Sequence, residues 1–364
     1  DNPGTISLGQ GVVSWGPPET AYEGIDRFRE DVENHKYKLA QGIPPLLDQI
    51  GEKLKDENGI NVDPKDRVFV TAGANMAFIN AVLAIADVGD EIILPAPFYF
   101  NHEMAVTMLG CTPVVAPTDK NHQLDLDALR SAITKRSRAI VTISPNNPSG
   151  VVYPKKDLQA VTALCREFGL FHISDEAYEY FTFDGASHFS PGSAKDVDEH
   201  VISLFSLSKA YGFASWRIGY MVTPPQLIDA VKKIQDTNLI CPPVVSQFAA
   251  LEAIRTGRAY CEEKLTDVRD VRNLVIERLA GWEKFATIAP AKGAFYFLLK
   301  IKTGLDSLSV TQRLIEEYKV AVIPGSAFGL TENCFLRIAY GVLDRSTCQE
   351  ALDRLEKGLA AITS

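Results

Sequence analysis

The sequence predicts an α/β fold in which helices cover both faces of a mostly parallel sheet, accompanied by a smaller α+β domain. Between residues 65 and 222, apolar runs of strand length alternate with amphipathic helical patterns. Several of these runs lack polar alternation, which is typical of a sheet buried on both faces. After about residue 240 a long helical region precedes shorter strands. A chain of 364 residues is longer than one hydrophobic core usually serves, so we expect two domains.

The elements of the large domain follow one another as strand and helix. Strands are expected at residues 67–71, 91–94, 113–116, 138–143, 170–174, 201–205 and 218–222, and helices at 76–85, 126–133 and 158–168. The later part is expected to hold a helical region over 244–279, strands at 294–301, 320–323 and 334–338, and a helix over 346–361. These patterns predict a large domain over residues 41–243 and a small domain over residues 244–364.

The first forty residues form a separate feature. They contain Trp15, several prolines and little periodicity, which indicates an arm that packs against another part of the molecule. We assign residues 1–40 to this arm and to part of the small domain.

Composition disfavours several classes of partner. The net charge of −9 argues against nucleic acid or an anionic membrane as the main partner, because both reward a basic face. No apolar stretch approaches the ~20 residues that span a bilayer, and the first residues lack the pattern of a signal peptide. Six cysteines and six histidines are scattered without a C-x-x-C or H-E-x-x-H motif, so we expect a cytoplasmic protein with no metal site.

Ligands of an open α/β sheet bind beyond the carboxyl ends of its strands, so the residues that follow each strand are informative. Ala74 and Asn75 follow the first strand at the start of a helix, where backbone N–H groups and the helix dipole favour an anion. Asn147 lies in a turn after the strand at 138–143 and can donate from its amide. Read alone, each segment is better explained as an ordinary turn.

The next strand ends at Asp175, and a buried carboxylate needs a partner. A protonated nitrogen heterocycle, an arginine or a metal would serve, although only His172 lies near enough in sequence to be a second metal ligand. Tyr178 can present its phenol to the same region. Arg337, in an apolar strand, likewise demands an anion, for which an internal Asp or Glu is the simplest candidate.

The strand at 201–205 is followed by SLSKAYGFASWRIGY. Ser206 offers a hydroxyl, Lys209 an amine and Arg217 a guanidinium. Apolar surroundings lower the pKa of a lysine and make it a usable nucleophile and base. A lysine whose charged end reaches the surface is the alternative for Lys209 taken alone.

Together these strand ends offer what pyridoxal phosphate requires. Its aldehyde takes a lysine as a Schiff base, its pyridinium nitrogen pairs with a carboxylate, and its ring oxygen accepts from amide and phenol donors. Its phosphate binds backbone N–H groups, hydroxyls and an arginine. The joint occurrence of these groups in one α/β domain is far more specific than any one of them.

With these groups at its strand ends, the sequence resembles the class I/II aminotransferases of fold type I, which are pyridoxal-phosphate enzymes. The resemblance covers almost the whole chain. Asn147-Pro148-Ser149-Gly150 is similar to the family's Asn-Pro-x-Gly, Asp175-Glu176-Ala177-Tyr178 to Asp-x-x-Tyr, and Ser206-Leu207-Ser208-Lys209 to Ser-x-Ser-Lys, with Arg217 eight residues later. The resemblance implies a three-layer fold with a seven-stranded sheet.

The resemblance also implies roles for the cofactor-binding residues. Lys209 would form the Schiff base, Asp175 would pair with the pyridinium nitrogen, and Asn147 and Tyr178 would bind the ring oxygen. Tyr99 would stack on the ring, with Phe98 as its competitor for that position. The phosphate would be held by four groups, which are Ser206, Arg217 and the backbone amides of Ala74 and Asn75.

Substrate and partner are implied in the same way. Arg337, helped by Gly11 and Asn147, would grip the α-carboxylate of an amino acid, and Lys209 would move the proton of the substrate Cα. The reaction would be a ping-pong transfer of an amino group between an L-amino acid and a 2-oxo acid. Tyr37 is similar to the tyrosine that reaches the neighbouring subunit's phosphate, which implies a homodimer.

The identity of the amino acid is less strongly indicated. Asn75 stands where an aspartate-using branch carries a lysine, and Leu8-Gly9-Gln10-Gly11 resembles the branch acting on glutamine, methionine, kynurenine and aromatic amino acids. His102 stands where relatives often have tyrosine. An apolar side-chain pocket is expected from Trp15, Tyr22, Phe98 and Phe328. Aspartate amino transfer, a carbon–sulfur lyase and a non-enzymatic regulatory module are the alternatives; the last is disfavoured because no basic helix-turn-helix segment precedes residue 40.

Overall fold

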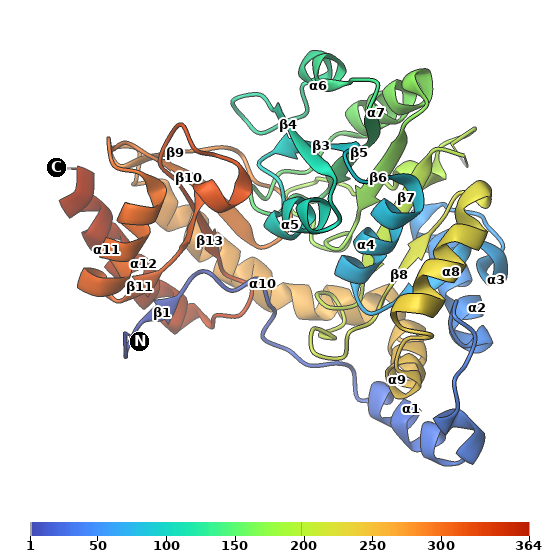
Figure 1. Cartoon of the computed structure of the whole chain (residues 1–364). Helices are drawn as coiled ribbons and strands as arrows, with labels where there is room; N and C mark the ends of the chain where they lie inside the picture. Colours follow the sequence, from blue (N-terminus) through green and yellow to red (C-terminus); the bar gives the residue numbers. More distant parts are fainter. Residues whose placement is uncertain (1, 198, 364) are drawn as a thin grey trace.

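The computed structural model describes residues 2–197 and 199–363 and contains a seven-stranded sheet (Figure 1). Its strands lie in the order β2-β8-β7-β6-β5-β3-β4, and β8 runs antiparallel to both of its neighbours while the other pairs are parallel. All seven strands expected from the sequence are present. Their bounds are Val68–Thr71 (β2), Glu91–Ala96 (β3), Thr112–Pro117 (β4), Ser137–Ile143 (β5), Phe171–Asp175 (β6), Val201–Ser206 (β7) and Gly219–Val222 (β8).

Helices cover both faces of this sheet, which confirms the three-layer prediction. One face packs against α4 (Ala74–Ile85), α5 (Phe100–Met108) and α8 (Ile228–Asn238). The other packs against α2 (Pro44–Lys53), α6 (Leu126–Ala132), α7 (Lys155–Phe168) and α9 (Val244–Arg255). In β3, Ile92 and Leu94 join the first core and Ile93 joins the other, because successive side chains of a strand point to opposite faces.

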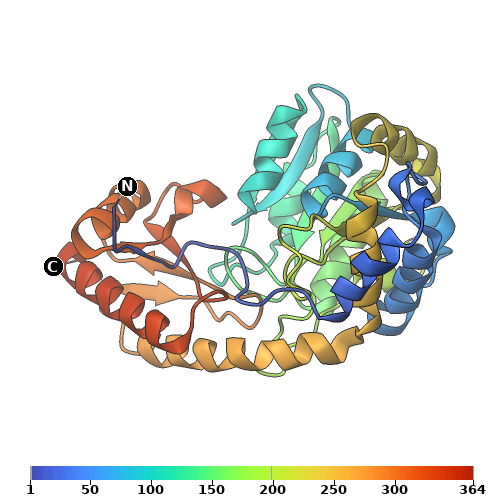
Figure 2. The same cartoon turned by 90° about the horizontal axis from the view of Figure 1, so that it is seen from below.

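A second sheet lies apart from the first and is antiparallel, in the order β12-β13-β10-β9. Its strands are β9 (Ala286–Ile288), β10 (Tyr296–Ile301), β12 (Ile323–Pro324) and β13 (Phe335–Ala339), with α11 (Ser307–Tyr318) and α12 (Arg345–Thr363) beside them. The long helix α10 (Gly257–Leu279) runs between the two regions (Figure 2). The domain boundaries at residues 40 and 243 stay a prediction.

The helical region expected over residues 244–279 is two helices. Helix α9 ends at Arg255 and α10 starts at Gly257. Gly257 has φ +68°, in the left-handed region that only glycine adopts without strain, so the α-helical path is interrupted there.

The N-terminal arm contains a helix that the sequence did not predict, α1 (Thr20–Arg29). It packs tightly on α9, since a side chain at Gly24 would collide with the backbone of Phe248. Strand β1 (Ile6–Ser7) instead pairs with β11 (Val320–Ala321) beside the second sheet. Residues 8–19 therefore cross from one region to the other, as Figure 2 shows for the dark blue segment.

The remaining elements are short. They are α3 (Pro64–Arg67), the π-helical turn Leu54–Asn58 and the 3₁₀ turns Val32–His35, Pro191–Ser193, Pro225–Leu227 and Gly325–Phe328. In the described part of the chain, no helix is long and apolar enough to cross a membrane, and no group of three or more metal-binding side chains occurs. The six cysteines are all buried and unpaired.

Candidate active site

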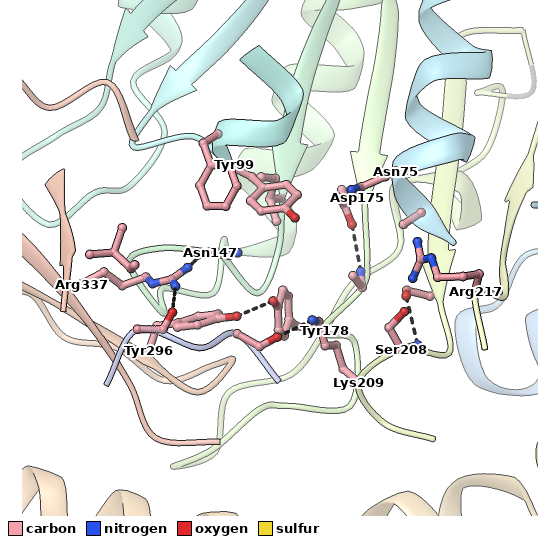
Figure 3. Close-up of a pocket in the computed structure, with 18 residues that line it drawn as sticks. Asn75, Tyr99, Asn147, Asp175, Tyr178, Ser208, Lys209, Arg217, Tyr296 and Arg337 are labelled. Carbon is pink, nitrogen blue, oxygen red and sulfur yellow. Dashed lines mark hydrogen bonds between the residues drawn. The ribbon is translucent and has the colours of Figure 1, made fainter. Parts of the chain in front are cut away.

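A pocket of about 280 Å³ lies at the carboxyl ends of the large sheet (Figure 3). Eleven of the twelve residues predicted for the site line it, and Tyr37 is the exception, with 78% of its surface exposed. The residues from the region of the large sheet include Ala74, Asn75, Tyr99, Phe100, Asn147, Asp175, Tyr178, Ser206, Ser208, Lys209 and Arg217. The arm contributes Gly9 and Gly11, and the second region contributes Tyr296, Ile323 and Arg337. Tertiary structure thus brings together segments from the whole chain.

One end of the pocket is built for an anion. Helix α4 begins there after Gly73, and no side chain caps its N-terminus, so its first N–H groups are available to a ligand. Arg217 lies against this turn and donates to the carbonyl oxygens of Ala72 (3.0 Å) and Ala214 (2.9 Å). A Cβ atom at Gly73 would collide with the Arg217 guanidinium. Glycine is therefore required for the arginine to approach the helix end.

Lys209 occupies the middle of the pocket, and its Nζ donates to the carbonyl oxygen of Gly11 at 2.5 Å. Burial is the main cause that lowers the pKa of Lys209 to about 8, and the positive charges of Arg337 and Arg217 act in the same direction. Asp175 opposes the shift. A lysine with such a pKa exchanges its proton near neutral pH, as a nucleophile and base requires.

Asp175 ends β6 and is buried with His102 behind it. His102 Nε2 lies 3.1 Å from Asp175 Oδ2, and the backbone N–H of Ala177 donates to Oδ1 at 3.1 Å. The imidazole stacks on Phe78 with ring centroids 4.0 Å apart. These contacts hold the carboxylate in one orientation while it still lines the pocket.

The opposite end of the pocket holds Arg337, as Figure 3 shows. Its guanidinium donates to Asn147 Oδ1 at 2.8 Å and to the carbonyl oxygen of Gly9 at 2.6 Å. Its Nε is buried without a hydrogen-bond partner, and no carboxylate of the described residues forms an ion pair with it. No Asp or Glu of the described residues thus pairs with Arg337, contrary to the simplest interpretation of the sequence. A carboxylate ligand fits this end of the pocket. Because arginine can only donate, Asn147 must turn its oxygen toward Arg337, which leaves its Nδ2 group as a donor.

Aromatic rings form much of the remaining wall. Tyr99 lines the pocket, whereas Phe98 belongs to the core on the α4 side of the sheet, so Tyr99 is the ring placed to stack on a ligand. The hydroxyls of Tyr178 and Tyr296 lie 2.6 Å apart. Trp15, Tyr22, Phe98 and Phe328 do not line this pocket. Its larger aliphatic and phenyl side chains are instead those of Phe100, Ile143 and Ile323.

The sequence did not predict several residues of the site, among them Gly9, Tyr296, Phe100 and Ile323, nor the pairing of His102 with Asp175. Gly9 lies within the quoted Leu-Gly-Gln-Gly motif, which was the available signal for it. Tyr296 follows Gly293-Ala294-Phe295 at the start of an expected strand, where nothing in the local pattern marks an active-site residue. His102 was noticed for its position, but its pairing with Asp175 depends on how α5 packs beside β6.

The chain is similar to known proteins over nearly its whole length. The family model described as aminotransferase class I and II matches residues 3–355. An aromatic-amino-acid aminotransferase 2 of Thermococcus litoralis is 35% identical, covering 98% of this chain and 92% of the relative. An aspartate aminotransferase of Pyrococcus abyssi is 36% identical, with coverages of 97% and 91%. The crystal structure of an aromatic aminotransferase from Pyrococcus horikoshii has a TM-score of 0.92 at 34% identity, covering 98% and 96%.

Proposed function

Because the chain belongs to the class I and II aminotransferases, and is therefore a pyridoxal-phosphate-dependent aminotransferase, we propose that its amino donor is an L-amino acid with an uncharged aromatic or apolar side chain. The single observation that supports this choice is the set of charged side chains that line the pocket. Its lining contains three cationic side chains, Lys209, Arg217 and Arg337, against one carboxylate, Asp175.

The donor set of this pocket fits pyridoxal phosphate. The open N-terminus of α4, Ser206 and Arg217 suit the phosphate. At the ring, we assign Asp175 to the nitrogen and Tyr99 to stacking. The ring oxygen is assigned to the Nδ2 group of Asn147 and the hydroxyl of Tyr178, and the aldehyde to Lys209.

When bound, the cofactor supplies an aldehyde that takes amino groups and a ring that accepts electrons from the substrate Cα. Lys209 Nζ is the group that takes the proton from the substrate Cα and donates it to the cofactor carbon, since its lowered pKa lets it hold either protonation state. Asp175 holds the proton of the facing nitrogen, and His102 keeps the carboxylate in place. Arg337 holds the α-carboxylate, which orients the Cα–H bond toward Lys209.

Each cation that the described residues of this chain place in the pocket then has a task, and none of these is left for a second carboxylate. Arg217 serves the phosphate, Arg337 the α-carboxylate and Lys209 the proton. Asn75, which stands where the aspartate-using branch carries a lysine, adds only a neutral amide to the lining. Phe100 and Ile323 present apolar surface instead, and burying apolar area there favours an aromatic or aliphatic side chain. The aspartate aminotransferase of P. abyssi makes aspartate the second candidate.

A screen of amino donors tests this proposal. The purified enzyme is given phenylalanine, tyrosine, methionine, glutamine, kynurenine, aspartate or glutamate with a series of 2-oxo acids, and kcat/KM is measured for each pair. We expect phenylalanine or tyrosine to exceed aspartate by about 10- to 100-fold, the usual value of filling an apolar pocket against burying an unpaired charge. A preference for aspartate would refute the charge argument. Pyruvate and ammonia formed without an acceptor would instead indicate the lyase alternative.

A homodimer is the second part of the proposal. Tyr37 and its neighbour Leu39 are exposed, at 78% and 58%, in the arm near an exposed Val32 (73%). Exposed apolar side chains grouped in one segment are typical of an interface. Sedimentation velocity should give twice the chain mass, and Tyr37→Phe should weaken cofactor binding if its hydroxyl reaches the neighbouring phosphate. A monomer with full activity would exclude this arrangement.

The location of the enzyme belongs to the same proposal. A reducing compartment such as the cytoplasm agrees with six unpaired cysteines, all of them buried. Cell fractionation with an antibody against the chain would test it, and recovery from an oxidising compartment would contradict it.

A further inference from the structure

Tyr296 joins two functional groups that the proposed mechanism treats separately. It is the first residue of β10, which pairs with β13, and Leu298 of β10 lies opposite Arg337. This register places the Tyr296 side chain between Arg337 and Tyr178, as Figure 3 shows. The residue is fully buried and lines the pocket.

The hydroxyl of Tyr296 contacts the phenol proposed to bind the cofactor. Its oxygen lies 2.6 Å from the hydroxyl oxygen of Tyr178. Each hydroxyl carries one proton and can accept two hydrogen bonds. If Tyr178 donates its proton to the cofactor's ring oxygen, it can only accept from Tyr296. Burial raises the pKa of Tyr296 to about 12 and also raises that of Tyr178, so both phenols keep their protons at neutral pH.

The ring of Tyr296 has a different neighbour. The Arg337 guanidinium carbon lies 4.5 Å from its centroid and 5.1 Å from that of Phe328. A cation over an aromatic face is stabilised by the ring quadrupole, more strongly where water is excluded. Two rings and the acceptors Asn147 and Gly9 therefore fix Arg337 before any substrate carboxylate arrives.

The arm also touches this residue. A Cβ atom on Gly11 would lie 2.7 Å from the Tyr296 hydroxyl oxygen, so only glycine lets the arm approach so closely. The carbonyl oxygen of the same Gly11 accepts from Lys209. Tyr296 thus lies beside the acceptor of the lysine as well as beside Tyr178.

We propose that Tyr296 is a positioning residue with two separable tasks. Its hydroxyl donates to Tyr178 and thereby directs the Tyr178 proton to the cofactor's ring oxygen. Its ring holds Arg337 in place for the α-carboxylate of the substrate. The proposal deepens the proposed function, because it rests on the roles given there to Tyr178 and Arg337.

Two substitutions separate the tasks in the cofactor-loaded enzyme. Tyr296→Phe removes only the hydroxyl, and Tyr296→Leu removes the ring as well. The first readout is the pKa of the bound cofactor, which is measured by following its visible absorption as a function of pH. This pKa does not depend on turnover. A weaker hydrogen bond from Tyr178 stabilises the anionic ring oxygen less, so this pKa should rise by about 0.5 to 1 unit in both variants.

The second readout is KM for the amino donor. We expect Tyr296→Phe to leave KM within about twofold of the wild-type value, since its ring still faces Arg337. Tyr296→Leu should raise KM about tenfold, the usual value of a desolvated cation–π contact. If Tyr296 had a purely structural role, the cofactor pKa and KM for the amino donor would both change in each of the two variants. Should the leucine variant fail to fold, the phenylalanine variant still tests the hydroxyl.

Tyr178→Phe provides the matched control. Adding Tyr296→Phe to it should leave the pKa of the visible band unchanged, because the hydroxyl acts only through Tyr178. A full shift in the double variant, or no shift in Tyr296→Phe alone, would overturn the proposal. Failure of the proposed function would look different, because the wild-type enzyme would then show neither the visible band nor amino transfer.

Discussion

His102 Nε2 lies 3.1 Å from Asp175 Oδ2, and at most 5% of the surface of either residue is exposed. The two residues come from α5 and β6, 73 positions apart in the chain. The histidine stacks on Phe78 and so cannot turn away from the carboxylate. Asp175 is therefore held from behind, with the pocket in front of it.

Replacing Asp175 should reduce turnover more than replacing His102. Asp175→Asn should lower kcat/KM by at least about 100-fold, since a buried hydrogen bond to a charged group is lost directly at the cofactor. His102→Phe keeps the stacking on Phe78 but removes the imidazole nitrogen that lies 3.1 Å from the carboxylate, so a decrease of about tenfold is expected. Steady-state kinetics with saturating cofactor measures both. Equal losses would contradict the assignment of His102 as a residue acting through Asp175.

Lys209 should make the stability of the cofactor-free protein depend on pH. Its pKa is lowered from 10.5 to about 8 in the folded chain, mainly by burial. Between these values the unfolded chain binds more protons, so the free energy of unfolding rises with pH from about 8 to about 10.5. Below pH 8 the destabilisation is fully present and constant.

Urea unfolding of the wild-type apoprotein and Lys209→Met at pH 7 and pH 10 isolates this contribution. The wild type should gain on the order of 2 kcal/mol relative to the variant between the two pH values. The difference between the two proteins cancels the titration of other groups, including the buried tyrosines. If the difference in the free energy of unfolding between the two proteins is the same at pH 7 and pH 10, the folded chain does not lower the pKa of Lys209.

Arg337→Lys should impair substrate binding and spare the cofactor. A lysine keeps the charge but loses the planar fork that matches a carboxylate, so kcat/KM for every amino donor should fall about 100-fold, mainly through KM. Arg337 and Arg217 lie at opposite ends of the pocket (Figure 3), so the dissociation constant of the cofactor should change little. Loss of cofactor binding in this variant would place Arg337 at the phosphate instead.

Lys53→Met tests a buried ion pair that supports the Asp175–Tyr178 segment. Lys53 Nζ lies 2.6 Å from a Glu179 carboxylate oxygen, and 5% and 10% of the two side chains are exposed. Asn58 donates to the same carboxylate at 2.8 Å. Leaving Glu179 buried without its cation should lower the free energy of unfolding by about 3–5 kcal/mol.

An exposed pair of the same length serves as control. Arg130 and Glu167 are also 2.6 Å apart, but about half of each side chain is exposed. Water screens this pair, so Arg130→Met should change the unfolding midpoint little. Similar effects of the two substitutions would mean that burial does not decide the contribution of Lys53.

Local patterns were sufficient for most of the fold. All seven strands of the large sheet follow from apolar runs bounded by turns, because buried strands have a composition that needs no knowledge of their neighbours. Helices α1, α2, α5, α8 and α11, strand β9 and the break at Gly257 were not among the expected elements. Helix α1 is stabilised by its contact with α9, and one glycine in a left-handed conformation outweighs the helical pattern around it.

By itself, the sequence determined the family, the cofactor and most of the pocket, since strand-end motifs such as Ser206–Lys209 carry their chemistry within a few residues. Tertiary structure alone decided which side chains meet. The Tyr178–Tyr296 hydroxyl contact joins residues 118 positions apart, and that of Arg337 with Asn147 joins residues 190 apart. Such contacts depend on strand register and on how the two sheets are placed by α10. No periodicity within a segment encodes that placement, because it is set by packing between segments.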